Sequence, residues 1–471
     1  MTLLPILVLT GLGVGIGLVR DVRFRRASLL LVSVVAVYSL QPATPLRSAS
    51  FWLPTLGLLL TVLVGLAVRP RQAPWRQTFL TCGALAAIVL ALAAARSLPL
   101  GLGPPLVPPW AGIAAAVGAI GVVASVVYLR PVASRWLGAG LALLILAAFV
   151  ILKSEPLSIA ASSGLRRLAG QSPELAAPID LTWLGFSYLA FRLLHLLLDR
   201  RAGRLPDANL AEVVTYALFF PALSAGPIDR LERFVEDLRR APALTPESAR
   251  EGGKRILLGL VKKFVIADSL AMIALQPVSA ERVTAGGWLW VLLYAFSFQL
   301  YFDFSGYTDV AVGTATLVGI RLPENFRRPY LQPNLTAFWN RWHITLADWF
   351  RSYVFNPLTR ALRGLPHPWP AAVVIFIGQL TTMVLLGLWH GIGWGFVIWG
   401  AWHGLGLFLQ NRWSAWTRPT AARLVTRPIA QQALTAAGTL LTFHFVTLGW
   451  VWFTLPDTAQ AVRVMARLLG G

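Results

Sequence analysis

The sequence has 471 residues, of which 56% are hydrophobic and only 13% are charged, with a formal net charge of +21. Soluble chains carry about a quarter charged residues, so this composition excludes a soluble globular protein. The basic residues stand in short runs between apolar blocks and form no single patch. That pattern excludes a nucleic-acid-binding protein and is typical of cytoplasmic loops in membrane proteins. Cys82 is the only cysteine, which excludes a disulfide framework within the chain.

Long apolar blocks predict an all-α, multi-pass membrane protein, because about 20 apolar residues cross a bilayer as a helix. Every backbone polar group in lipid must be paired, and the sustained alternation of a β-barrel is absent. Residues 3–18 lack a preceding basic region and precede four arginines, so we expect a first crossing and no signal peptide. Alternating basic and poorly charged loops predict seven crossings as far as Arg200. The clearest blocks are residues 53–67, 79–95, 110–129, 137–152, 181–198, 371–388 and 434–453.

Two apolar stretches fit a crossing poorly. Residues 211–225 are short, contain Pro221 and precede residues 229–263, which carry nine Lys or Arg against six Asp or Glu and which a full crossing would place outside. Residues 338–355 contain several polar residues and are flanked by basic segments on both sides. We therefore expect both stretches to be re-entrant or interfacial, beside eleven to thirteen transmembrane helices.

The expected organisation is one continuous membrane domain with three parts. Residues 1–178 form amino-terminal transmembrane helices, residues 179–455 form the functional core and residues 456–471 form a short tail. No internal repeat of the transporter kind is present in the sequence. No polar stretch is long enough to bury a core of its own.

Ionisable residues at membrane depth are functional candidates. Asp303 and Asp309 flank Gly306, and either cap helices at a glycine break or belong to a polar network or proton relay. The aromatic run 338–343 contains Asn340, Arg341 and His343; it is either an interfacial belt with a snorkelling arginine or part of a site.

Histidines in the carboxyl-terminal half are the main candidates for chemistry. His390 lies between Gly387 and Gly391, which permit close approach of another backbone or a substrate. It is either a structural residue or a neutral imidazole available to accept a proton. For His403 and His444 we favour structural hydrogen bonds, whereas His195 and His367 resemble helix-face and loop residues. The spacing predicts no metal site, and neither a phosphate loop nor a Gly-x-Ser-x-Gly elbow is present.

Taken in order, a series of segments resembles the membrane-bound O-acyltransferase superfamily, in its bacterial polysaccharide O-acetyltransferase branch. The resemblance extends over residues 181–453. Its segments are residues 219–228, 259–268, 301–309, 323–326, 338–343, 349–351, 387–391 and 399–400.

The resemblance implies that His390 is the active-site histidine and that His343 is the second catalytic position. It also implies a ring of helices around a central tunnel with re-entrant segments lining it. The other residues expected along the tunnel or at the substrate are Asn340, Trp342, Trp389, Ser305 and Asp309.

The implied activity is transfer of an acyl group, in the simplest case acetyl, from a cytoplasmic thioester to a hydroxyl of an extracytoplasmic polysaccharide. The donor is acetyl-CoA or an acyl carrier protein, and no bound cofactor is expected. Four basic residues either hold the donor's phosphate or reflect the ordinary cytoplasmic charge bias; they are Lys262, Lys263, Arg327 and Arg328.

The expected setting is the inner membrane of a bacterium, surrounded by membrane lipid. The resemblance implies an extracytoplasmic serine-hydrolase-like transferase as a partner. Two rival interpretations are a transporter or flippase with a histidine proton pathway and a scaffold subunit without chemistry. The sequence leaves open the acceptor polymer, the acyl group and the donor carrier.

Overall fold

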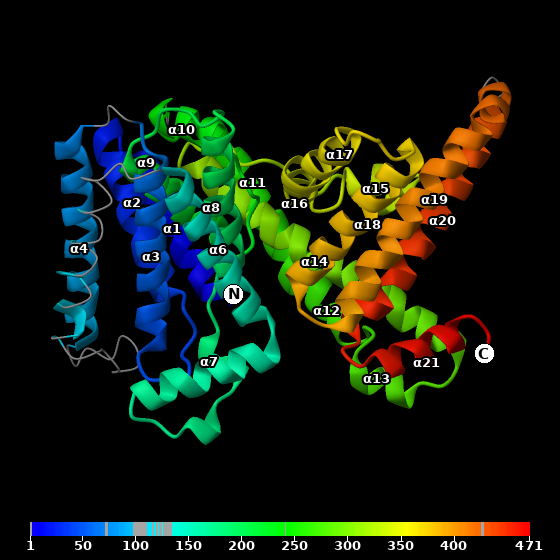
Figure 1. Ribbon diagram of the computed structural model, residues 1–471, viewed down its shortest axis with the longest axis horizontal. Coiled ribbons are helices and arrows are strands. Elements are labelled where there is room, and N and C mark those ends of the chain that lie inside the picture. Colours follow the sequence, from blue (N-terminus) through cyan, green and yellow to red (C-terminus); the bar gives the residue numbers. More distant parts are fainter. Residues whose placement is uncertain are drawn as a thin grey trace. The chain divides into compact units, whose positions relative to one another are not determined.

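The computed structural model describes residues 2–70, 74–97, 134–240, 242–424 and 428–471, with residue 110 and scattered residues of 112–125. All regular structure in this part of the chain is helical (Figure 1), apart from one isolated bridge between Phe326 and Trp342. The predicted all-α class is therefore confirmed. The crossing expected at residues 110–129 lies largely outside the described residues.

The chain divides into two compact units. Unit 1 contains Met1–Leu257 and Asp309–Pro323, and unit 2 contains Leu258–Thr308 and Glu324–Gly471. This division differs from the boundaries expected at residues 178 and 455, which stay a prediction. It follows the packing of one long helix, α14, whose carboxyl-terminal turns belong to unit 1 and whose remainder belongs to unit 2.

Unit 1 holds ten labelled helices of the described part of the chain. They are α1 (Leu3–Leu18), α2 (Val22–Ser39), α3 (Ala49–Val68), α4 (Trp75–Ser97), α6 (Ser134–Lys153), α7 (Glu155–Leu168), α8 (Phe186–Arg201), α9 (Leu210–Leu218), α10 (Leu231–Arg240) and most of α11 (Pro246–Leu260). Short 3-10 turns occur at Pro173–Leu175, Pro178–Leu181 and Phe220–Ala222.

After the last residues of α11, unit 2 contains a π-helical stretch, Val261–Ala267, and a second one at Arg351–Phe355. A 3-10 turn occurs at Pro329–Leu331. Its α-helices are α12 (Asp268–Ala271), α13 (Pro277–Arg282), α14 (Gly286–Leu317), α15 (Leu335–Trp339), α16 (Ile344–Phe350), α17 (Asn356–Arg363), α18 (Ala371–His390), α19 (Trp394–Leu424), α20 (Pro428–Thr454) and α21 (Thr458–Leu468).

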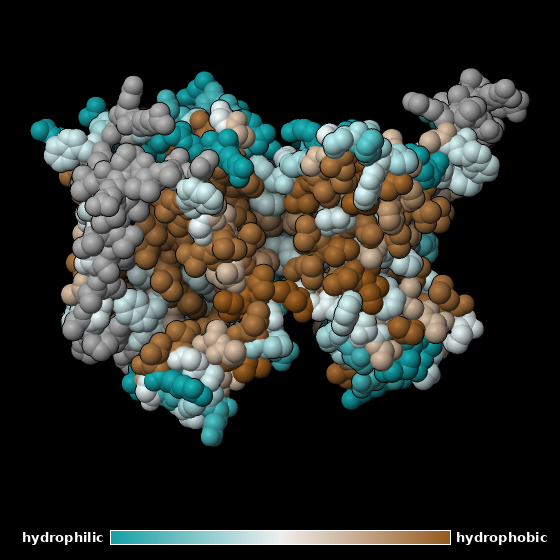
Figure 2. Space-filling model, viewed as in Figure 1, coloured by the Kyte–Doolittle hydropathy of each residue, from teal (hydrophilic) through white to brown (hydrophobic). Residues whose placement is uncertain are grey.

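Five described helices are long and apolar enough to cross a membrane, namely Ala49–Val68, Trp75–Ala95, Trp136–Lys153, Ala371–His390 and Pro428–Thr454. Each coincides with an apolar block of the sequence. In each unit taken by itself, hydrophobic side chains cover the flank between hydrophilic ends (Figure 2). The chain is thus a helical membrane protein, and the number of eleven to thirteen crossings stays a prediction.

The two stretches expected not to cross are broken into short helices. Helix α9 has nine residues, a rise of roughly 14 Å, which is less than half of a bilayer core. The buried guanidinium of Arg192 donates to the carbonyls of Ala217 at 3.0 Å and Ala222 at 2.8 Å. These bonds satisfy backbone groups released where the helix stops. Residues 335–363 likewise form three short helices and a π-helical turn.

Helices α18 and α19 form a hairpin whose close packing depends on glycine. A Cβ atom at Gly387 would lie 2.2 Å from the backbone oxygen of Phe396, and one at Gly400 would lie 2.5 Å from that of Met383. Small residues at such crossings allow membrane helices to approach closely. Gly387, three residues before His390, therefore permits the close approach of another backbone. This is one of the two roles that the sequence suggested for it.

Candidate functional site

His343 and His390 line the same small cavity in unit 2. Its volume of about 40 Å³ exceeds the space that a single water molecule requires. Its other lining residues are Leu300, Phe304, Trp339, Trp342, Leu346, Leu386, Trp399, Trp450 and Phe453. The fold thus brings together two histidines from separate segments and encloses them almost entirely in aromatic and aliphatic side chains.

His390 is the last residue of α18. Its ring centroid lies 4.4 Å from that of Trp389 and 4.7 Å from that of Phe453, and it stacks on Phe396 at 6.1 Å. The carboxyl terminus of a helix carries partial negative charge, which favours a positive charge developing at this position. A histidine here is suited to accept a proton in surroundings that exclude bulk water.

His343 precedes α16 and has a left-handed backbone with φ of 43°. Its side chain is 3% exposed and lies edge-on to Phe304, with ring centroids 4.6 Å apart. Burial lowers the pKa of His343 to about 3, so the imidazole is neutral near pH 7. Its Nε2 atom has no hydrogen-bond partner among the described residues. Buried polar atoms are normally paired, so this atom is suited to a polar substrate group.

Asn325 fixes the turn on which His343 sits. Its Oδ1 atom accepts from the Thr345 hydroxyl at 2.6 Å and from the Thr345 N–H at 3.3 Å, and its carbonyl accepts from Ile344 N–H at 3.0 Å. Asn325 is completely buried. In the sequence, the signal for Asn325 is its place within the segment 323–326 of the ordered series.

A larger cavity of about 240 Å³ lies beside the first and shares Trp339 and Leu386 with it. Asn340 lines this larger cavity, where its Oδ1 atom accepts from Arg351 Nη2 at 2.5 Å. The remaining lining residues are Thr336, Ala347, Phe350, Phe355, Gln379, Thr382, Met383 and Leu407. The indole of Trp339 and the side chain of Leu386 thus stand between the larger space and the histidines.

The other expected tunnel residues occupy different places. Trp342 lines the histidine cavity, whereas Trp389 contacts both histidine rings, at 5.8 Å from His343 and 4.4 Å from His390. Ser305 is buried within α14 and Asp309 pairs with Arg255 at 2.9 Å, and neither lines the histidine cavity.

The interpretation of Asp303 and Asp309 as helix caps is wrong, because both lie inside the continuous helix α14. Gly306 does not break this helix. A Cβ atom there would lie 2.8 Å from the carbonyl oxygen of Gly259, so the glycine permits a close helix crossing. The two carboxylates pair with basic side chains, Asp303 with Lys263 and Asp309 with Arg255. The alternative of a structural polar network agrees with these pairs.

The four basic donor candidates divide into two pairs. Lys262 and Lys263 lie in the π-helical stretch, where Lys263 forms its ion pair with Asp303. Arg327 and Arg328 are exposed in the segment after α14. Their contact with a donor phosphate stays a prediction.

Of the remaining histidines, His444 makes the expected structural hydrogen bonds, to the Tyr294 hydroxyl at 2.9 Å and the Leu440 carbonyl at 2.8 Å. For His403 the expectation is wrong, since neither ring nitrogen has a hydrogen-bond partner within the described part of the chain. His403 is instead enclosed by the rings of Trp339, Trp399 and Phe445.

Other positions fall where the sequence suggested. His195 lies on α8 and pairs with Asp199 at 3.2 Å, and His367 is exposed in the loop before α18. No group of three or more His, Cys, Asp or Glu residues capable of holding a metal occurs in the described residues.

Comparison with known families agrees with this helical membrane fold. The model of the membrane-bound O-acyltransferase family matches residues 133–448, and the chain belongs to this family. The match begins earlier than residue 181, from which the resemblance was apparent in the sequence.

Curated relatives fall into two groups. The chain is 31% identical to the teichoic acid D-alanyltransferase of Streptococcus thermophilus over 58% of this chain and 68% of the relative. It is 33% identical to the probable alginate O-acetylase AlgI of Pseudomonas putida over 72% of this chain and 64% of the relative. It is 34% identical to the teichoic acid D-alanyltransferase of Bacillus subtilis over 58% of this chain and 69% of the relative. The chain spans about two thirds of the length of each of these three relatives.

Proposed function

We propose that this protein transfers an acyl group, in the simplest case acetyl, from a cytoplasmic thioester to a hydroxyl presented from the other side of the membrane. The single observation that carries the proposal is the cavity lined by both His343 and His390. The names of the relatives, alginate O-acetylase and teichoic acid D-alanyltransferase, favour an extracytoplasmic polymer as the final acceptor. The setting that fits these relatives is the inner membrane of a bacterium.

His390 acts as the general base in this proposal. As the acceptor oxygen attacks the thioester carbonyl carbon, the hydroxyl proton passes to the imidazole of His390. The carbon–sulfur bond then breaks, and the leaving thiolate takes the proton back from the imidazolium, so that an ester and a free thiol remain. Proton transfer of this kind accelerates a reaction about 10²–10⁴-fold.

His343 stabilises the oxygen of the carbonyl during attack. Its imidazole is neutral and buried, and Nε2 faces no protein partner in the described residues. With the proton on Nε2, a neutral ring can donate to a developing oxyanion, and the enclosed site makes that bond stronger than in water. The turn held by Asn325 fixes the ring before substrate binds.

The larger cavity provides the route for the donor. It lies next to the histidine cavity, has a volume of about 240 Å³ and carries Asn340 and Arg351 on its wall. The donor is acetyl-CoA or an acylated carrier protein, and Lys262, Lys263, Arg327 and Arg328 are candidates for its phosphate. The acyl group then passes to polysaccharide directly or through a serine-hydrolase-like partner outside the membrane.

Purified protein in nanodiscs, supplied with radiolabelled acetyl-CoA or acetylated carrier protein and a polysaccharide oligomer, tests this function. We expect donor-dependent ester formation and a loss of about 10²-fold or more in His390→Ala. His367→Ala is the matched control, because it removes an exposed loop imidazole. A folded His390→Ala protein that retains wild-type turnover would overturn the assignment. Absence of turnover with every donor would favour a transporter or scaffold.

A further inference from the structure

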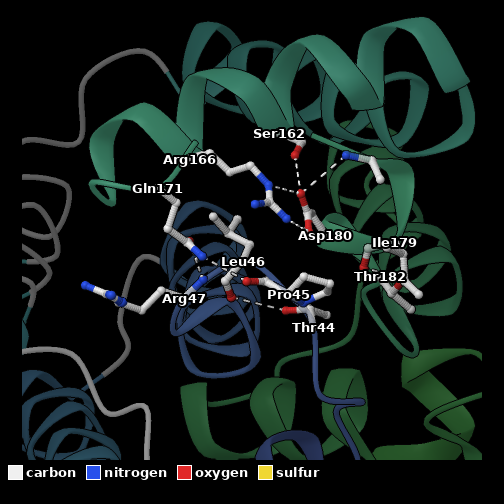
Figure 3. Close-up of polar contacts among 11 residues, drawn as sticks. Thr44, Pro45, Leu46, Arg47, Ser162, Arg166, Gln171, Ile179, Asp180 and Thr182 are labelled. Carbon is white, nitrogen blue, oxygen red and sulfur yellow. Dashed lines mark hydrogen bonds and ion pairs between the residues drawn. The ribbon is translucent and has the colours of Figure 1, made fainter. Parts of the chain in front are cut away.

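Helix α7 of unit 1 turns a polar side toward the protein. Ser158, Ser162 and Arg166 recur every four residues, so they share one face, and all three are buried. Arg166 donates to both carboxylate oxygens of Asp180, at 2.5 and 2.8 Å (Figure 3). The Ser162 hydroxyl adds a third bond to this carboxylate at 2.5 Å. The buried side of α7 is therefore a satisfied polar clamp.

The apolar residues of α7 point away from the protein. Leu157, Leu165 and Leu168 are 44%, 41% and 86% exposed. Leu157 and Leu168 are eleven positions apart, about three helical turns, so they lie on the same side of the helix. A surface helix in water has the opposite arrangement, with its apolar stripe toward the core. The exposed side of α7 thus requires a cover other than water.

The position of α7 identifies that cover as lipid. It follows directly on α6, the least buried of the five candidate spans, which exposes Leu143, Leu144 and Leu146. Within unit 1, α7 runs across the ends of α3 and α6 rather than alongside them (Figure 1). The apolar surface of the spanning helix therefore continues onto a helix that lies where a bilayer ends.

The orientation of unit 1 gives the side of the membrane. Helix α10 lies at the end of unit 1 opposite α7 (Figure 1), and the same end holds the basic run at residues 20–26, because Arg26 donates to the carbonyls of Leu238 and Arg239 on α10. Basic ends of membrane proteins face the cytoplasm. The α7 end of unit 1 is then extracytoplasmic.

We propose that α7 is an interfacial helix whose exposed leucines enter the outer leaflet of a phospholipid bilayer. Such helices bury an apolar face roughly 5–10 Å into the boundary between headgroups and acyl chains. The Arg166–Asp180 clamp holds the polar side inward, and Gln171 ties the following segment to the α2–α3 connection by bonding Arg47 N–H at 2.8 Å and the Pro45 carbonyl at 3.0 Å (Figure 3). These bonds thus hold α7 and the segment after it in a fixed position at the membrane surface.

The test places an environment-sensitive NBD fluorophore on the full-length protein in a Cys82→Ser background. Leu157→Cys and Leu168→Cys carry the probe on the exposed leucine side, and Glu174→Cys, exposed in the following turn, is the control. The proteins are placed in phosphatidylcholine–phosphatidylglycerol nanodiscs. Two quenchers are compared: lipids with a doxyl group near the headgroup and aqueous iodide.

We expect emission from positions 157 and 168 to be shifted to the blue and quenched by the shallow doxyl lipid, with little effect of iodide. Position 174 should show the reverse. Iodide quenching at 157 and 168 equal to that at 174 would overturn the proposal, because the helix would then lie in water. Protection from both quenchers would also overturn it, since protein would cover the face. Where Leu168→Cys fails to fold, Leu165→Cys replaces it.

Discussion

Gly387→Ala tests whether the spacing of α18 and α19 sets the position of the active histidine. Gly387 lies three residues before His390, and an added Cβ would stand 2.2 Å from the carbonyl oxygen of Phe396. Non-bonded heavy atoms settle at about 3.5 Å, so the two helices must separate by roughly 1 Å at this point. Neither partner is a flexible side-chain end that could move aside.

The separation has two measurable consequences. A displacement of about 1 Å in a catalytic group can cost ~10²-fold in rate, and we expect a kcat loss of this order. Overpacking should also lower stability by about 1–3 kcal/mol. Thiol release from the acyl donor measures the first effect, and the melting temperature of the protein in detergent measures the second.

Gly83→Ala is the matched control, because a Cβ at Gly83 on α4 would meet no atom within 4 Å. Both substitutions add one methyl group to an apolar helix and differ in what that group meets. Wild-type turnover in Gly387→Ala would refute the packing argument. An equal loss in Gly83→Ala would show that the assay reports membrane insertion instead of the site.

Three further predictions concern the polar groups. His343→Ala should lower kcat by ~10²-fold through loss of an oxyanion donor while leaving KM nearly unchanged. Because the folded pKa of His343 is about 3 and its ordinary value is 6.5, the unfolded state binds more protons between these limits. Stability should therefore fall as pH decreases through that window, and less so in His343→Gln, as denaturation at several pH values would show. Arg166 lowers the pKa of Asp180 in the folded protein. The stability that the α7 clamp contributes should therefore be present above the unfolded pKa of about 4 and be lost as the pH falls below it. Arg166→Met should lower the free energy of unfolding by about 3–5 kcal/mol, and Asp180→Asn should lower it less. Asn325→Ala should cost about 1–3 kcal/mol and reduce turnover, with a Thr345→Val protein retaining more of both.

The apolar blocks determined the membrane helices because a run of about 20 apolar residues has one stable solution in lipid. The blocks at residues 53–67, 371–388 and 434–453 each appear within a single helix of the structure. The breaks near Pro221 and in residues 338–355 were equally visible, since proline and charged residues oppose a straight crossing. The residue types within a single segment are therefore enough to predict where a membrane helix forms and where it breaks.

Other assignments depended on neighbours distant in the chain. A carboxylate beside a glycine has the same local pattern whether it caps a helix or pairs across a crossing, and only the position of Lys263 and Arg255 decided between these for Asp303 and Asp309. Hydropathy did not indicate helix α7, because its leucines are spread along a mixed sequence. Its polar face turns toward the protein because Arg166 bonds Asp180, fourteen residues further along the chain.

The sequence by itself determined that this protein is helical, spans a membrane and carries the ordered motifs of its family, because composition and short spacings survive without knowledge of packing. Only the tertiary structure decided that His343 and His390 share one cavity, that Asn325 holds the turn beneath His343, and that His403 lies among indoles. Those relations join side chains that no periodicity connects, and they exist because helices packed through glycine bring distant segments within contact distance.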